Sequence, residues 1–150
     1  MENIFSNQGV ESFLKRLDKL TPESKGLWGK MNVSQMLAHC NVTYEMCYEN
    51  KHPKPNGLVR FILKMFVKKF VTNEVPYKKS VKTAPQFIIT DQKEFNIEKN
   101  RLKNFILKTQ ELGETYFEGK ESLSFGNLTS KEWNNMFAKH LDHHFGQFEV

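Results

Sequence analysis

The chain has few residues that could cross-link it covalently. Only 2 of its 150 residues are cysteine, Cys40 and Cys47. On one helix these two would lie about 10 Å apart along the axis at a rise of ~1.5 Å per residue, whereas a disulfide needs Cα atoms less than about 7 Å apart. Free thiols in a reducing compartment are therefore expected, which predicts a cytoplasmic protein.

Long apolar runs are absent as well. Residues 1–5 (MENIF) lack the basic start and the apolar stretch of a signal peptide. The mostly apolar segment 58–71 is interrupted by Arg60, Lys64 and Lys68, and a membrane span needs about 20 predominantly apolar residues. The sequence therefore predicts no transmembrane segment.

The composition that remains is that of one globular domain covering residues 1–150. Phenylalanine occurs 13 times, so an aromatic core is expected. The chain has 22 basic and 17 acidic residues, and the surplus is not gathered in one block. Charge alone therefore does not predict a nucleic-acid partner.

Apolar spacing and turn chemistry predict helices and little strand. Asn32 with Gln35, and Thr129 with Glu132, have the spacing of capping boxes, which places the starts of two helices sharply. One short extended piece is expected at residues 87–90. The expected helices cover residues 6–20, 32–49, 58–71, 92–112 (ending at Gly113) and the segment from 129 onward.

The last of these helices carries the most informative pattern in the chain, a pair of histidines four residues apart. His140 and His144 would lie one turn above each other with Cβ atoms roughly 5–6 Å apart. At about 100° per residue they flank the direction of Trp133, so they continue the buried apolar stripe. Two imidazoles at this spacing can reach one metal ion.

A third ligand is available on the second helix. His39 shares an inward face with Thr43 and Met46, and three histidines would leave coordination positions open, as in catalytic metal sites. His143 points about 80° away from the stripe, so we expect it to line the pocket or support the ligands. Gln147, one turn further on, is placed to orient a ligand or a substrate.

The same residues have a simpler interpretation. A lone histidine on an apolar face, such as His39, is more often a hydrogen-bonded core residue than a ligand. For His140 and His144 the spacing leaves both interpretations open, since burying two imidazoles costs free energy unless both find partners. His52, in a lysine-rich turn beside Pro53, is expected to be solvated.

Two segments carry a family resemblance. Residues 28–39 read WGKMNVSQMLAH and residues 140–147 read HLDHHFGQ. The first resembles the entry to the second helix of the DinB/YfiT-like superfamily, in which a Trp-containing turn precedes a helix with one metal-binding histidine. The second resembles that superfamily's last helix, with two histidines four apart and Gln three after the second. Residues 125–133 (FGNLTSKEW) are similar to its small bacterial branch of unknown function.

This resemblance implies an all-α fold, an up-down-down-up four-helix bundle with a long crossover and one extra short helix. It implies a divalent metal held by His39, His140 and His144, with nickel or zinc favoured because imidazole suits both. Characterised relatives include thiol-dependent S-transferases and isomerases. The implied function is therefore a metal-dependent transferase or hydrolase that acts on a small molecule, with a low-molecular-weight thiol as a further cofactor. Phe145 stands where the superfamily often has Arg, so no substrate contact is carried over there.

Non-catalytic helical binding modules remain as alternatives, in which the histidines would be structural. Residues 78–82 (KKSVK) suggest nucleic acid, but no recognised binding motif accompanies them. The helix expected at 58–71 is most simply a core helix of the bundle, but it could instead lie on a membrane surface or bind a protein partner. Its apolar residues exceed what one core face needs, which predicts a homodimer. These residues are Leu58, Phe61, Ile62, Met65, Phe66 and Phe70.

Overall fold

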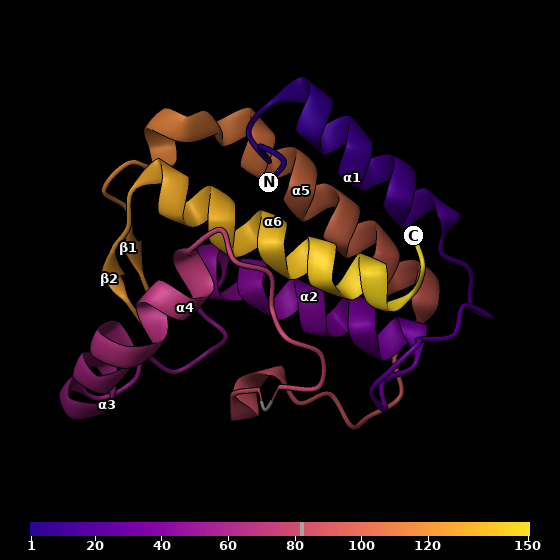
Figure 1. The fold of residues 1–150 in the computed structure, drawn as a ribbon, viewed down its shortest axis with the longest axis horizontal. Helices are drawn as coiled ribbons and strands as arrows, with labels where there is room; N and C mark the ends of the chain where they lie inside the picture. The colour runs from indigo at the N-terminus through magenta and orange to yellow at the C-terminus, as the bar shows by residue number, and fades with distance from the viewer. Residues whose placement is uncertain (82) are drawn as a thin grey trace.

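The computed structural model describes residues 1–81 and 83–150, and the chain it describes is mostly helical (Figure 1). Lys82, part of the basic segment 78–82, lies outside the described residues. The long helices are α1 (Asn7–Lys19), α2 (Val33–Tyr48), α5 (Phe95–Phe117) and α6 (Ser130–Gln147). The short elements are α3 (Gly57–Ile62), a π-helical turn (Leu63–Val67), α4 (Lys68–Thr72), a 3₁₀ turn (Pro85–Phe87) and the paired strands β1 (Glu121–Ser122) and β2 (Gly126–Asn127).

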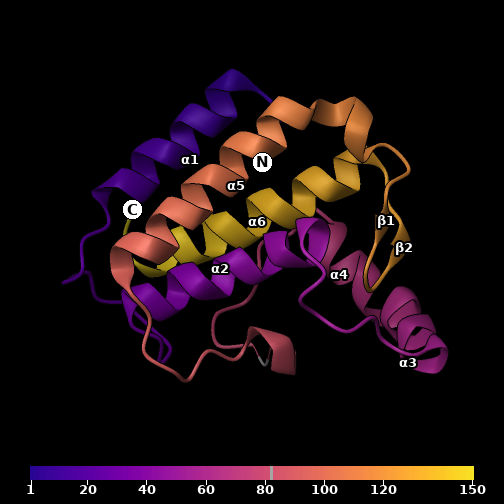
Figure 2. The same ribbon diagram turned by 180° about the vertical axis from the view of Figure 1, so that it is seen from behind.

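The four long helices lie side by side around one core, and they are the helices that position the site (Figures 1 and 2). The expected aromatic core is confirmed. Tyr44 of α2 is stacked between Phe105 of α5 and Phe137 of α6, with ring centroids 5.5 and 4.7 Å away. Trp133 and Phe117 extend this cluster toward the β1–β2 hairpin. The fully buried rings therefore fix α2 against α5 and α6.

Both capping boxes are confirmed. The Asn32 side chain accepts from the backbone of Gln35, and the Gln35 side chain accepts from the backbone of Asn32. Thr129 and Glu132 make the same reciprocal pair at the start of α6. Because each box satisfies two N–H groups that a helix start leaves free, α2 and α6 begin where the sequence predicts.

The break expected at Gly113 is confirmed, since Gly113 has a non-helical φ of 71°. The helical segment does not end there, however, because a further helical turn follows and ends at Phe117. That turn forms because Phe117, 0% exposed, packs against Trp133 and Phe137. Of the extended piece expected at 87–90, Phe87 is instead the last residue of the 3₁₀ turn, whereas Ile88 has extended backbone angles.

The helix expected at 58–71 is not one regular helix. The backbone N–H of Lys68 reaches back five residues to the carbonyl of Leu63, which makes a π-helical turn between α3 and α4. We call this segment, residues 57–72, the arm. Figure 1 shows α3 at its outer end, away from the four long helices. No residue of α3 or of the π-helical turn is buried.

The inner end of the arm is fixed to α6 by a buried lysine. Lys139, 2% exposed, donates from Nζ to the carbonyl oxygens of Phe70 (2.7 Å) and Asn73 (2.8 Å) and to Asn73 Oδ1 (2.8 Å). Burial lowers the pKa of Lys139 to about 8. These bonds satisfy carbonyl groups at the end of α4, so the arm enters the fold at a defined place beside the histidines.

Cys40 and Cys47 are both free, as expected. Among the residues that the structure describes, none of the helices is both long and apolar enough to span a bilayer.

Candidate metal centre

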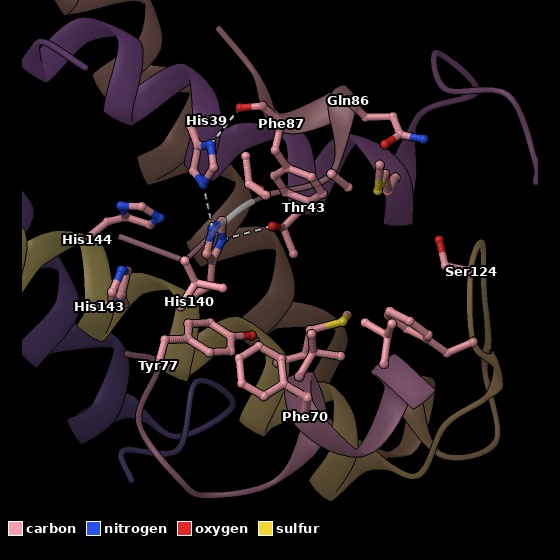
Figure 3. Close-up of a pocket in the computed structure, with 18 of the residues that line it drawn as sticks. His39, Thr43, Phe70, Tyr77, Gln86, Phe87, Ser124, His140, His143 and His144 are labelled. Atoms are coloured by element: carbon pink, nitrogen blue, oxygen red, sulfur yellow. Dashed lines mark hydrogen bonds between the residues drawn. The ribbon is translucent and has the colours of Figure 1, made fainter. Parts of the chain in front are cut away.

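The structure brings His39, His140 and His144 together on the facing sides of α2 and α6 (Figure 3). One ring nitrogen of each residue lies within 4.8 Å of the others. His39 Nε2 and His140 Nε2 are 3.0 Å apart. His39 is 101 positions before His140 in the chain, so the packing of α2 against α6 creates the cluster.

The backbone carbonyl of Phe87 determines which ring nitrogen of His39 carries the proton. His39 Nδ1 lies 2.7 Å from the backbone oxygen of Phe87, at the end of the 3₁₀ turn. A carbonyl oxygen can only accept, so Nδ1 must carry the proton, and Nε2 keeps its lone pair. His39 is buried, and its unprotonated Nε2 accepts a hydrogen bond from Nε2 of His140 at 3.0 Å (Figure 3).

Gln147 places the proton of His144 on Nδ1 in the same way. Its Nδ1 lies 2.8 Å from Gln147 Oε1. The orientation of the Gln147 amide is fixed because its Nε2 donates to the backbone oxygen of Trp28 at 2.6 Å. The amide oxygen therefore faces His144 and accepts from Nδ1, which leaves His144 Nε2 with its lone pair.

The turn around Gly29 makes room for that amide. Gly29 has a φ of 84°, in the left-handed region that favours glycine. A Cβ atom added there would lie 2.7 Å from Gln147 Nε2, too close for a real contact. Only glycine therefore allows the chain to follow this path while Gln147 bonds to both Trp28 and His144.

His140 is held by a hydroxyl group. Its Nδ1 lies 2.9 Å from Oγ1 of Thr43, one turn after His39 on α2. A hydroxyl can accept or donate, so Thr43 can match either tautomer of His140. All three imidazoles are thus anchored through Nδ1. This arrangement, in which the second nitrogen is fixed by a carbonyl, amide or hydroxyl oxygen, is typical of histidines that bind metals.

Burial keeps these rings neutral. Desolvation lowers the pKa of His39, lowers that of His140 well below its usual value, and lowers that of His144 to about 3. The neighbouring imidazoles add to the effect, since protonating one disfavours protonating the next. A metal ion binds the neutral imidazole, so near neutral pH a proton does not compete for these nitrogens.

His143 does not join the cluster. Its half-buried ring lies between Trp28 and Tyr77, with centroids 5.8 and 5.7 Å away, on the wall of the pocket. Desolvation lowers its pKa. In this place it lines the pocket beside the three clustered rings.

Sequence reasoning missed three of the groups around the site. Thr43 was placed on the face of His39, but helical spacing gave no sign that it would reach His140. Phe87 and Tyr77 lie in the long connection after the arm, where no periodicity indicates a position. The expectation for His52 was wrong: it is partly buried, and its Nε2 lies 2.8 Å from Glu45 Oε2. Glu45 also pairs with Arg101, so its carboxylate is engaged by His52 and Arg101 and not by the three clustered histidines.

The three histidines form part of the wall of a cavity of about 390 Å³. That volume is within the range of pockets that bind small molecules. The remaining wall comes from α2, the arm, the connection after it, the hairpin and α6, and most of its side chains are apolar. None of the described residues that line it is Asp or Glu.

Comparison with known proteins gives a family but no activity. No curated protein and no solved structure matches the chain. The resemblance to the DinB/YfiT-like superfamily is not among the matches and stays a prediction. Residues 6–150 match the family described as "Protein of unknown function (DUF1569)", and the chain belongs to that family.

Proposed function

We propose that His39, His140 and His144 together bind one divalent transition metal ion, nickel or zinc, and that the protein is a metal-dependent enzyme. The observation that carries the proposal is the anchoring of all three rings through Nδ1, with nitrogens of the three rings within 4.8 Å of one another. The hydrogen bond between His140 Nε2 and His39 Nε2 accounts for the approach of those two rings. His144 converges on the same point although its Nδ1 is already bonded to Gln147, and a shared ion would account for this third ring.

The spacing is close to that of a site for one ion. Nitrogen atoms bound to the same ion at ~2.0–2.1 Å lie roughly 3 Å apart. His39 Nε2 and His140 Nε2 are 3.0 Å apart, joined by a hydrogen bond that an ion would replace, and the nitrogens of all three rings lie within 4.8 Å of one another. Three protein ligands leave open positions, which is the composition of catalytic rather than structural sites. The open positions would accept water or a low-molecular-weight thiol.

Neutral imidazoles leave the ion its full charge, so a bound water or thiol loses its proton more readily. The protein's own residues would position the ligands, exclude water and transfer a proton. Thr43, Gln147 and the Phe87 carbonyl hold the ligand rings in place, and the apolar wall excludes bulk water. Since no described carboxylate lines the cavity, His143 is the group we assign to move a proton near the cluster.

These features support a thiol-dependent S-transferase or a hydrolase acting on a small molecule. The nucleic-acid alternative has less support, because Lys79 of the basic segment lies with Nζ 4.3 Å from the centre of the Trp28 ring at the pocket. The two free cysteines support a cytoplasmic location. The exposed apolar residues of the arm support a homodimer.

The experiment is metal loading followed by a thiol-transfer assay. Wild-type protein incubated with nickel or zinc and desalted should retain close to one ion per chain, while His140→Ala and His144→Ala should retain little. Met65→Ala, on the exposed face of the arm, is the matched control and should load like wild type. Wild type that retains no more metal than the histidine variants would refute the proposal. If metal binds, transfer and hydrolysis assays with small thiols then separate the two reaction classes.

A further inference from the structure

The cavity extends well beyond the histidines, along two antiparallel helices. His39 lies against His144 and His140, Thr43 against His140, and Tyr44 against Phe137, so α6 is followed backward as α2 is followed forward. From His39 the lining of α2 continues to Cys47, eight residues on. At a rise of ~1.5 Å per residue, this is roughly 12 Å of wall.

The lining of α6 runs a similar distance in the opposite direction. After His144 and His140 come Met136 and then Trp133, which also lines the cavity. Trp133 is seven residues from His140, or roughly 10 Å at the helical rise. Both helices thus carry polar nitrogen ligands at one end of a channel and large apolar or sulfur-containing side chains toward the other.

The two sides of this channel away from the histidines are mostly apolar. Leu63 and Val67 of the arm face the cavity, and Leu123 and Phe125 of the hairpin close it at the other side, together with the small polar side chains of Ser122 and Ser124. In Figure 3 the clustered histidines lie at one end of the drawn residues, and Ser124 lies at the other end, far from them. A ligand made only of polar atoms would leave most of this wall unmatched.

We propose that the cavity binds an amphiphile. Its polar, metal-binding head group would lie at His39, His140 and His144, and a linear apolar chain would follow α2 and α6 toward the hairpin. The inference rests on the proposed metal centre for the head group, whereas the apolar channel stands on its own lining. It assigns the substrate class of the site: medium-length chains are accepted, and compact polar molecules bind weakly.

The experiment uses two ligand series on the full chain. One is butyl, hexyl, octyl and decyl hydroxamates with the metal-loaded protein, measured by calorimetry. The other is the primary alcohols of the same lengths with the metal-free protein, measured by displacement of an environment-sensitive dye. In both series each added methylene should tighten binding by about fourfold until the chain fills the channel, since a buried methylene contributes about 0.8 kcal/mol.

A bulky side chain that fills the channel should abolish the dependence of binding affinity on the length of the ligand's chain. Val67→Trp narrows the far part of the channel, so octyl and decyl ligands should lose about tenfold or more in affinity while butyl ligands and metal content stay unchanged. Met65→Trp places the same ring on the exposed side of the arm and should behave like wild type. Affinity that does not vary with chain length, or equal losses for short and long chains in Val67→Trp, would overturn the inference.

The two series also separate this inference from the proposed function. If the protein takes up no metal but the alcohols still bind with a length-dependent affinity, the metal centre is wrong and the channel is right. If hydroxamates bind the loaded protein equally well at every length, the metal centre is right and the amphiphile is wrong.

Discussion

The histidine cluster and the arm are neighbours on the same cavity, yet they are held in opposite ways. Each clustered imidazole has a specific partner for Nδ1 and lies between two long helices. In the arm, neither α3 nor the π-helical turn has a buried residue, and Phe66 is 76% exposed. The polar part of the cavity is thus rigidly determined, and the apolar part is bounded on one side by a loosely covered helix. Rigid ligand geometry beside an adaptable apolar wall suits a site that fixes a head group and tolerates different chains.

The largest expected difference between the core around the cluster and the arm is in how much a substitution lowers the free energy of unfolding. Phe137→Ala removes a ring that is 1% exposed in the core between the long helices, so it should lower the free energy of unfolding by about 3–5 kcal/mol. Phe66→Ala in the arm should change it by less than about 0.5 kcal/mol. Urea unfolding at a protein concentration low enough to keep single chains measures both. Equal losses at the two positions would show that the arm is part of the cooperative core.

Acid should destabilise the cluster rather than the arm. The folded-state pKa of His144 is lowered to about 3, against about 6.5 in an unfolded chain. The unfolded chain therefore binds more protons between these values, and stability falls as pH falls below about 6.5. For His144 alone the loss between about pH 6.5 and 5 is roughly 2 kcal/mol. In metal-free protein this slope should be reduced in His144→Leu. An unchanged slope would show that the pKa of His144 is the same in the folded and the unfolded chain.

A change outside the cluster should weaken metal binding without touching a ligand. In Gly29→Ala the new methyl group would displace the Gln147 amide and thereby free the His144 ring. Loss of such a supporting bond costs about tenfold or more in metal affinity. Competition with a chromophoric chelator measures the effect. Gly57→Ala is the matched control, because an added Cβ there meets nothing within 4 Å. Equal metal affinities for the two variants would show that the hydrogen bond from His144 to Gln147 does not support metal binding.

The smallest effect on the fold should come from a charge placed on the arm. Phe66→Glu should leave the unfolding free energy of the single chain within about 0.5 kcal/mol of wild type. It should nevertheless convert a homodimer into single chains, because the carboxylate would be buried in the apolar interface. Light scattering of wild type and variant measures the mass. A wild-type protein with the mass of one chain contradicts the predicted homodimer.

The features predicted correctly from sequence are those encoded within a few residues. The starts of α2 and α6 follow from Asn32 with Gln35 and from Thr129 with Glu132, whose side chains act on their own helix. The inward direction of His140 and His144 follows in the same way from helical spacing. Gly113 was correctly placed as a break, but the extra helical turn after it depends on Phe117 reaching the core.

The features that sequence could not provide are contacts between distant segments. The Phe87 carbonyl that holds His39 is 48 residues away from it, in a connection without periodicity. Thr43 and His140 are separated by 97 residues. The π-helical turn in the arm had no sequence signal that we can identify. The candidate ligands could therefore be named in advance, while the groups that orient them and the channel beside them could not.

The central claim is that three imidazoles, and no other side chains, hold one metal ion. X-ray absorption at the zinc edge of the loaded wild-type protein tests it most directly, because imidazole nitrogens and sulfur scatter differently and at different distances. We predict three imidazole ligands at ~2.0–2.1 Å together with light-atom ligands from solvent. A shell with a sulfur ligand at ~2.3 Å, or with fewer than three imidazoles, would contradict the account.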